Sequence, residues 1–181
     1  MPTPSTAAHV THRTPLGSLT LAATDDALVL CAFDDREQAR ARLGRGGLTA
    51  LDVDVATSDQ RRILEEASRQ LDAYLGGHSR AFTVRTDLRL ATPFSRTTVE
   101  RLDGLLPYGA TGTYAELAAA LGRPRAARAV GTALGANPLC VVLPCHRVVG
   151  SGGRPTGYAG GLAAKRFLLD LESGRTLSAS L

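Results

Sequence analysis

The chain has 181 residues, 44% of them hydrophobic and 21% charged, with a formal net charge of +4 at pH 7. This balance is typical of one or two folded domains with a hydrophobic core, and it excludes a chain that is disordered throughout. No apolar run approaches the roughly 18 residues that a membrane-spanning helix needs, so we expect no membrane partner. The N-terminus lacks the basic start and apolar core of a secretory signal, and we therefore expect a cytoplasmic protein.

Cysteine and charge usage narrow the class further. Cys31, Cys140 and Cys145 are an odd number of cysteines without the spacing of a disulfide framework, which indicates free thiols in a reducing compartment. Residues 1–88 contain 10 arginines against 12 acidic residues, whereas residues 89–181 contain 11 basic residues against 5 acidic ones. The second half is therefore the candidate for binding a polyanion, although a solvated basic surface has the same balance.

After a disordered tail over residues 1–8, residues 9–88 are predicted to form an α/β domain. Three short apolar runs separated by turn residues favour an antiparallel meander. These runs cover residues 9–13, 16–23 and 27–33. Helices are predicted over 35–42 and 59–75, a loop over 45–49 and a further strand over 81–84. In the second helix an apolar stripe repeats every three or four residues, through Ile63, Leu64, Ala67, Leu71, Tyr74 and Leu75. This half contains no recognisable chemical motif.

Residues 89–175 are predicted to form a second, mostly helical domain, followed by a tail over 176–181. Its helices are expected over residues 93–106, 113–121 and 124–134. Thr113, with Glu116 three residues later, has the spacing of a capping box, and Gly122 is a typical helix stop. The last two helices are short and are joined by a tight turn that contains glycine, which predicts a helix-turn-helix.

Two further segments of this domain are typical of a ligand-binding surface. The helix over 124–134 is rich in Ala and Gly, which lets it approach another backbone closely, and it carries Arg125 and Arg128. Residues 150–161 contain six glycines around Tyr158, which favours a loop whose amides and aromatic ring bind a planar base. A tightly packed interior helix and a flexible surface loop are the respective alternatives.

The most reactive chemistry is expected at Cys145. It follows an apolar run over 139–143 that is typical of a buried strand, and it stands in the motif Pro-Cys-His-Arg. A cysteine reacts as its thiolate, for which His146 is a neighbouring base and Glu172 an available carboxylate to orient the imidazole. Adjacent residues of a regular strand point to opposite faces, so either Pro144 forces a turn that brings thiol and imidazole together or a water relays the proton. Cys31 and Cys140, inside apolar runs, are interpreted as small buried hydrophobic residues.

The motif Pro144-Cys145-His146-Arg147-Val148-Val149 resembles that of the methylated-DNA-protein-cysteine methyltransferases, also called 6-O-methylguanine-DNA methyltransferases. About half of the chain resembles the family closely and in order. The matching segments are Tyr114–Ala118, Arg123-Pro124, Ala126–Gly131, Gly135–Pro138, Thr156–Leu162 and Leu168–Glu172. The resemblance implies an RNase H-like domain over 9–88 and a winged-helix-like domain with the helix-turn-helix over 89–175. Cys140 is unusual beside the active segment.

The same resemblance implies irreversible, stoichiometric transfer of a methyl or larger alkyl group from the 6-oxygen of guanine in double-stranded DNA to Cys145. His146, held by Glu172, would draw off the thiol proton through water, Tyr114 would donate to the leaving guanine, and Asn137 would organise the turn around the cysteine. The implied base pocket comprises Tyr158, Val148, Ala159 and Arg147. We expect a monomer without a cofactor, and no metal, because the cysteines and histidines lack the tight spacing of metal ligands.

For DNA, the resemblance implies that the helix of Arg128 enters the minor groove. Arg128 would occupy the gap left when the damaged nucleotide is rotated out of the duplex, which is how enzymes reach a base inside the stack. The implied DNA-binding residues are Arg128, Arg125, Ala126, Ala127, Ala129, Gly131 and Thr113.

Three other functions are compatible with parts of the sequence. A lesion-binding module without catalysis would not need Cys145. A thiol hydrolase using Cys145 and His146 would have no use for the helix-turn-helix. A transcriptional regulator would bind with operator-dependent affinity, whereas a search through phosphate contacts is nearly independent of sequence and steeply salt-dependent.

Overall fold

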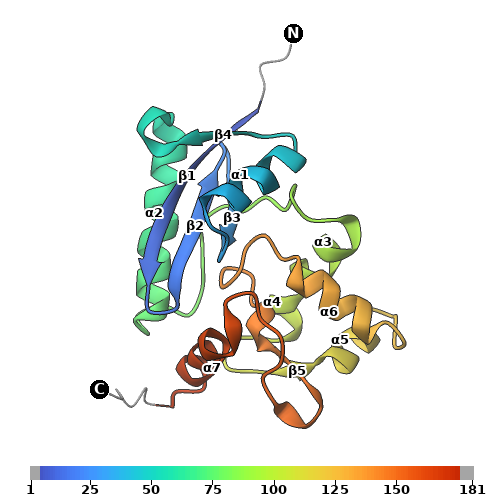
Figure 1. Cartoon of the computed structure of the whole chain (residues 1–181). Coiled ribbons are helices and arrows are strands. Elements are labelled where there is room, and N and C mark those ends of the chain that lie inside the picture. Colours follow the sequence, from blue (N-terminus) through green and yellow to red (C-terminus); the bar gives the residue numbers. More distant parts are fainter. Residues whose placement is uncertain (1–4, 176–181) are drawn as a thin grey trace. The chain divides into compact units, whose positions relative to one another are not determined.

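The computed structural model describes residues 5–175, which divide after residue 90 into two compact units (Figure 1). The predicted tail over 176–181 and the first four residues of the one predicted over 1–8 lie outside the described residues. The rest of the N-terminal prediction is wrong, because the first strand begins at Thr6 and both Ala7 and Ala8 are buried. Within residues 5–175 no helix is long and apolar enough to cross a membrane.

The first unit contains a four-stranded sheet in the order β3-β2-β1-β4. Its strands are β1 (Thr6–Thr14), β2 (Gly17–Ala23), β3 (Leu28–Ala32) and β4 (Thr49–Asp52). The first three pair antiparallel, which confirms the predicted meander, while β4 pairs parallel with the start of β1. The middle strand β2 and the edge strand β3 are both buried along most of their length.

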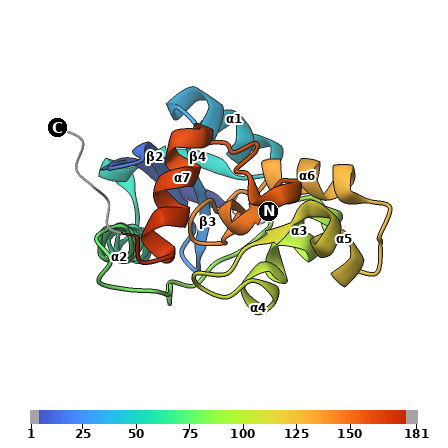
Figure 2. The ribbon, with the colours of Figure 1, turned by 90° about the horizontal axis from the view of Figure 1, so that it is seen from below.

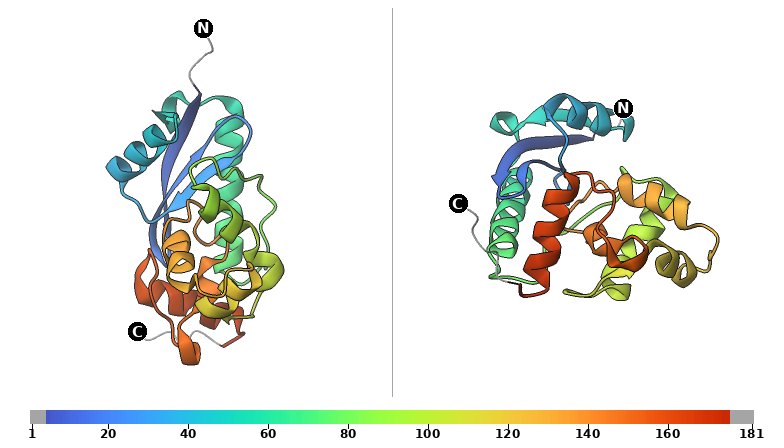
Figure 3. Two further views of the ribbon diagram at one scale, coloured as in Figure 1. Left: turned by 90° about the vertical axis from the view of Figure 1, so that its right-hand side faces the viewer. Right: turned by 60° about the horizontal axis from the view of Figure 1, so that its bottom comes forward.

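Helices cover both faces of this sheet. They are α1 (Arg36–Arg45) and α2 (Ser58–Leu75), with a 3₁₀ turn, η1 (Val53–Val55), before the second. Figures 2 and 3 show α1 and α2 on opposite sides of the strands. All six residues of the predicted apolar stripe on α2 are buried. Both helices begin with a capping box, in which Asp35 and Thr57 each accept from the backbone of a glutamine three residues later.

Two elements of the first unit differ from expectation. The predicted strand over 81–84 is irregular, because the backbone amides of Thr83 and Val84 donate to the side-chain Oε1 of Gln70, at 2.8 and 3.1 Å, instead of to a neighbouring strand. The fourth strand is β4, which begins where a loop was expected. It lies at the edge of the sheet and is only half-buried, so it lacks the apolar alternation that identifies a strand.

The second unit is mostly helical, as predicted. Its helices are α3 (Pro93–Glu100), α4 (Leu102–Leu105), α5 (Tyr114–Ala120), α6 (Ala127–Gly135) and α7 (Gly161–Glu172). Two short strands, β5 (Gly112–Thr113) and β6 (Val148–Val149), pair in parallel, and η2 (Cys145–Arg147) and η3 (Ser151–Gly153) are 3₁₀ turns.

The boundaries of these helices differ from the predicted ones in two places. The helix predicted over 93–106 is divided at Arg101 into α3 and α4. The hydroxyls of Thr97 and Thr98 bond carbonyls four residues back, which weakens a continuous helix. The helix predicted from Pro124 begins at Ala127, because residues 123–126 form a turn closed by the Ala126 amide on the Arg123 carbonyl at 2.8 Å.

The predicted helix-turn-helix is confirmed as α5 and α6. Thr113 caps α5 in a capping box with Glu116, as expected. Gly122 follows the helix with φ 72°, a left-handed conformation that favours glycine, and the Arg123 amide closes the turn on the Ala118 carbonyl at 2.8 Å. The chain therefore reverses tightly enough for α6 to pack on α5.

Candidate active site

The segment before Cys145 is a folded-back loop, and the strand predicted over 139–143 is wrong. The residues are largely buried, but the Leu143 amide donates to the Leu139 carbonyl at 2.8 Å and Val141 adopts a φ of 71°. Buried Asn137 closes the loop from inside: its Nδ2 donates to the Leu143 carbonyl at 3.1 Å, and its Oδ1 accepts from the Leu139 amide at 2.9 Å. A side-chain amide thus satisfies backbone groups that a strand would have paired with a neighbour.

Cys145 begins the 3₁₀ turn η2, and its thiol is buried and free of any disulfide. A hydrogen bond with the Cys140 side chain contributes most to lowering the pKa of Cys145. Burial of the thiol opposes this effect, whereas a hydrogen bond with Asn137 and the charge of Lys165 support it. The balance holds the Cys145 pKa below its ordinary value and favours the reactive thiolate.

His146 is fully buried and pairs with a carboxylate. Its Nε2 lies 2.5 Å from Oε1 of Glu172, near the end of α7. Burial lowers the pKa of His146, against the raising effect of Glu172, so the imidazole is neutral. Among the described residues its Nδ1 has no hydrogen-bond partner. Because Nε2–H donates to the carboxylate, Nδ1 carries the lone pair and is the basic atom of the ring.

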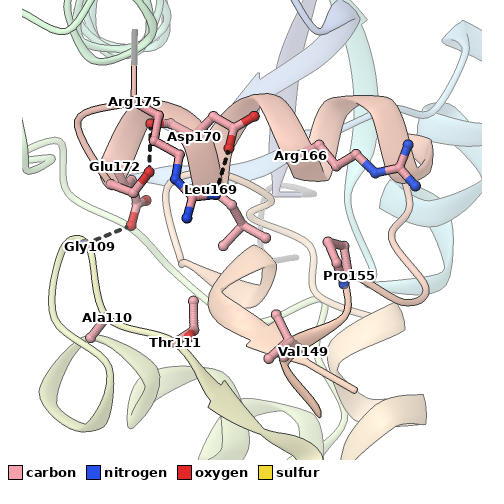
Figure 4. Close-up of a pocket in the computed structure, with 12 residues that line it drawn as sticks. Gly109, Ala110, Thr111, Val149, Pro155, Arg166, Leu169, Asp170, Glu172 and Arg175 are labelled. Carbon is pink, nitrogen blue, oxygen red and sulfur yellow. Dashed lines mark hydrogen bonds and ion pairs between the residues drawn. The ribbon is translucent and has the colours of Figure 1, made fainter. Parts of the chain in front are cut away.

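Glu172 is held by more than the histidine. Its Oε2 accepts from Arg147 Nε at 2.8 Å and from the Gly109 amide at 3.1 Å. Figure 4 shows the bond to Gly109 at the edge of a cavity of about 330 Å³. The guanidinium of Arg147 also donates to Asp103 Oδ1 at 2.9 Å and to the Leu106 carbonyl at 2.8 Å. The carboxylate therefore has one fixed orientation toward His146.

A separate cavity of about 200 Å³ opens beside Cys145. Its lining residues are Tyr114, Gly131, Leu134, Gly135, Cys145, Gly157, Tyr158 and Ala159. Two of the four residues assigned to a base pocket, Tyr158 and Ala159, are among them. Arg147 and Val148 are not: Arg147 is buried against Glu172 and Asp103, and the Val148 carbonyl accepts from Lys165. The assignment of Arg147 and Val148 to a base pocket stays a prediction.

Sequence reasoning missed Lys165. Its Nζ is buried and donates to the carbonyls of Val148 at 2.5 Å, Thr156 at 2.7 Å and Gly157 at 3.3 Å, which ties β6 to the glycine-rich loop. Burial lowers the pKa of Lys165, and the charge of Cys145 opposes that effect. The one available signal was compositional: Lys165 is the single lysine in a chain whose other basic residues are arginines. A compact ammonium can bond three converging carbonyls, a geometry that a planar guanidinium does not match.

The helix-turn-helix carries its small and basic residues as expected. Arg125, Arg128 and Ala129 are exposed, and Ala126, Ala127 and Gly131 are half-buried. Within residues 5–175 neither Arg125 nor Arg128 has an ion-pair partner. Gly131 faces the ring of Tyr114, and a methyl group there would lie 3.7 Å from it.

The remaining site residues lie close to these elements. Thr113 is half-buried and serves as the cap of α5. The Tyr114 hydroxyl donates to the Thr156 carbonyl at 3.1 Å. No group of three or more His, Cys, Asp or Glu side chains among the described residues is placed to hold a metal ion.

Comparison with known families matches both units. Residues 9–88 match the model of the 6-O-methylguanine DNA methyltransferase ribonuclease-like domain, and residues 93–174 match that of the DNA binding domain. A methylated-DNA--protein-cysteine methyltransferase of Methanosarcina acetivorans is 38% identical over 161 residues, covering 87% of this chain and 93% of the relative. One of Mycolicibacterium paratuberculosis is 40% identical over 158 residues, covering 87% of each.

Solved structures give the same result. The crystal structure of the Mycobacterium tuberculosis O6-methylguanine methyltransferase has a TM-score of 0.75 and 37% identity, covering 95% of this chain and 96% of that one. A structure of Mycobacterium tuberculosis OGT in complex with DNA has a TM-score of 0.72 and 36% identity, covering 93% of each chain. These matches confirm the predicted fold class, a ribonuclease-like α/β unit followed by a DNA-binding unit.

Proposed function

The chain belongs to the 6-O-methylguanine DNA methyltransferase family, and we propose that Cys145 is the residue through which it acts. Its activity is the direct reversal of DNA damage, in which a methyl group is transferred from methylated DNA to a cysteine of the protein. The observation that carries the assignment is the position of Cys145. Its thiol lines the cavity and has a lowered pKa, whereas Cys31 and Cys140 do not line that cavity.

The thiol proton leaves through His146. Nδ1 of His146 is the basic atom, and it has no hydrogen bond to the Cys145 thiol although Pro144 is followed by a tight turn. Of the two routes that the sequence left open, the geometry favours a water between Sγ and Nδ1. Glu172 and Arg147 act behind the imidazole, since the carboxylate stabilises the imidazolium that forms and the guanidinium holds the carboxylate.

The transfer itself is a displacement at carbon. The Cys145 thiolate attacks the alkyl carbon, a C–S bond forms, and the bond from that carbon to the 6-oxygen of guanine breaks. The released electron pair passes into the guanine, which takes a proton from the hydroxyl of Tyr114 as that group turns from the Thr156 carbonyl toward the base. The product is a thioether, and the site offers no group that would cleave it. Each molecule therefore repairs one lesion.

Double-stranded DNA carrying an alkylated guanine is the partner, and α6 is the element that meets it. The small residues Ala126, Ala127, Ala129 and Gly131 let the helix approach the minor groove, and Arg128 fills the space left by the rotated nucleotide. Arg125 contacts phosphate, and the cap at Thr113 fixes the start of α5. Tyr158 and Ala159 contact the base in the cavity. All of these groups belong to one chain, which acts as a monomer in the cytoplasm.

Mapping the acceptor tests the proposal. A duplex with one methylated guanine is mixed with the protein, and the masses of the proteolytic peptides that contain cysteine are measured by mass spectrometry. We expect one added methyl group on the peptide of Cys145 and none on those of Cys31 and Cys140. The Cys145→Ala variant should stay unmodified and still bind the duplex. A methyl group on Cys31 or Cys140 would overturn the assignment.

A further inference from the structure

The proposed reaction leaves the second thiol of the active loop, Cys140, without a role. Both Cys140 and Cys145 are buried and free of disulfides. In an extended strand two residues five positions apart are separated by about 16 Å, so their sulfur atoms cannot meet. A strand over 139–143, as the sequence predicts, would have carried the chain away from Cys140 before it reached Cys145.

The folded-back loop brings them together. The Val142 amide donates to the Cys140 carbonyl and the Cys145 amide to the Leu143 carbonyl, both at 2.8 Å, and Val141 between them adopts a φ of 71°. A β-branched residue rarely takes this conformation, so the surrounding bonds hold it there. As a result the Cys140 side chain lies within hydrogen-bond reach of the Cys145 side chain.

We propose that Cys140 is a positioning residue for methyl transfer, whose S–H group donates a hydrogen bond to Cys145 Sγ and stabilises the attacking thiolate. The inference rests on the proposed function, because it concerns the same nucleophile. A thiol is a weak donor in water. At a largely buried thiol bulk water competes little, and a hydrogen bond to a charged acceptor is strengthened.

The proton of Cys140 has an acceptor in both ionisation states of its neighbour. Cys140 Sγ lies 3.7 Å from the carbonyl oxygen of Asn137, which accepts the S–H while Cys145 is a neutral thiol. When Cys145 loses its proton, the S–H group of Cys140 rotates about the Cβ–Sγ bond and points toward the new negative charge. Neither state leaves a buried donor unpaired, which would be costly.

The other groups that face Cys145 act in the same direction or stand across the cavity. The Asn137 side chain and the Lys165 ammonium also stabilise the thiolate, from the loop and from α7. Tyr114 and Tyr158 line the cavity with it, and the neutral His146 follows it in η2. Among these groups, the hydrogen bond with Cys140 contributes most to lowering the pKa of Cys145.

The test compares the variants Cys140→Ala and Cys140→Ser with the unchanged protein. The control variant is Cys31→Ala, because Cys31 lies in β3 and is remote in sequence from the loop. Iodoacetamide, small enough for the cavity, alkylates Cys145, and the rate is followed against pH by weighing the Cys145 peptide. We expect Cys140→Ala to move the midpoint of the profile upward by about one pH unit, which lowers the rate below the midpoint about tenfold. Cys140→Ser should restore most of the rate, and Cys31→Ala should leave the profile unchanged.

Two results would overturn the inference: a Cys140→Ala profile that coincides with the unchanged protein, or a serine variant no better than alanine, which means that Cys140 only packs. If the Cys140→Ala variant does not fold, the infrared S–H stretching band of Cys140, recorded in the Cys31→Ala variant, tests the hydrogen bond instead. That band should move to lower frequency over the pH interval in which the Cys145 band disappears, and a fixed band contradicts the hydrogen bond. The iodoacetamide reaction needs no DNA, so it reports on the thiol pair even if methyl transfer maps to another residue.

Discussion

The loop that carries Cys145 and the helix α6 belong to the same unit, yet they hold their polar groups in opposite ways. In the loop, Asn137, His146 and Arg147 are buried and bonded to specific partners. On α6, Arg128 is exposed and has no ion-pair partner among the described residues. Fixed geometry in a low dielectric suits bond breaking, whereas free surface charge suits exchange of water and counterions for phosphate. The contrast indicates that chemistry and DNA capture can be damaged separately.

The largest effect is expected from His146→Ala. Loss of the base should slow single-turnover methyl transfer by about 10²–10⁴-fold, because proton transfer by a positioned side chain contributes that much. Affinity for the duplex should stay within twofold, since His146 is buried away from solvent. Transfer is followed by quenched-flow sampling and binding by fluorescence anisotropy. A parallel fall in both quantities would show that the two functions are not separable.

Next in size is the stability change in Glu172→Gln. The substitution removes the buried charged partner of the Arg147 guanidinium and leaves it only the exposed Asp103, which should cost about 3–5 kcal/mol in the free energy of unfolding. Asp170→Asn on the same helix is the matched control. Its ion pair with Arg175 is long, at 3.9 Å, and exposed, so its loss should cost no more than about 1 kcal/mol. Urea titration measures both, and equal values would contradict the role given to burial.

A smaller effect is expected from Arg125→Ala on the exposed side. Loss of one phosphate contact should weaken binding about equally for unrelated duplexes and reduce the slope of log affinity against log salt by about one. The rate of transfer at saturating DNA should not change. A loss confined to one base sequence would instead indicate that Arg125 reads a base.

The smallest effect is a dependence of stability on pH. Burial lowers the pKa of His146 in the folded state, so only the unfolded chain takes up a proton near the ordinary value of about 6.5. The stabilising contribution is therefore complete above about 6.5 and is lost as the pH falls below it toward the folded pKa. His9, whose pKa burial also lowers, contributes in the same direction from the first unit. Urea midpoints between pH 8 and 5 should fall less in His146→Gln than in the unchanged protein.

The sequence predicted the features that depend on local pattern. The stripe of α2, the capping box at Thr113 and the stop at Gly122 each follow from residues within one helix or its ends. The sequence likewise placed His146 beside Cys145 and paired it with the carboxylate of Glu172, and the structure contains that pair. These residues are recognisable because their chemistry requires particular side chains in order along the chain.

What the sequence did not predict depends on contacts between distant or irregular segments. An apolar run over 139–143 indicates burial but not the path of the backbone, which here follows from the bonds of Asn137 and the conformation of Val141. The hydrogen bonds of Lys165 go to backbone carbonyls, and the pattern of side chains along the sequence does not indicate such bonds. Strand β4 has no alternation to detect, because it is half-buried at an edge.

The separation of chemistry from DNA capture is tested most directly by giving each variant two substrates. Arg128→Ala and His146→Ala are compared in methyl transfer from a methylated duplex and from the free 6-O-methylguanine base, which needs no rotation out of a helix. We expect Arg128→Ala to lose at least about tenfold with the duplex, since rotation costs a few kcal/mol, and to keep its rate with the free base. His146→Ala should lose rate with both substrates. An Arg128→Ala protein that is equally slow with the free base would contradict the account.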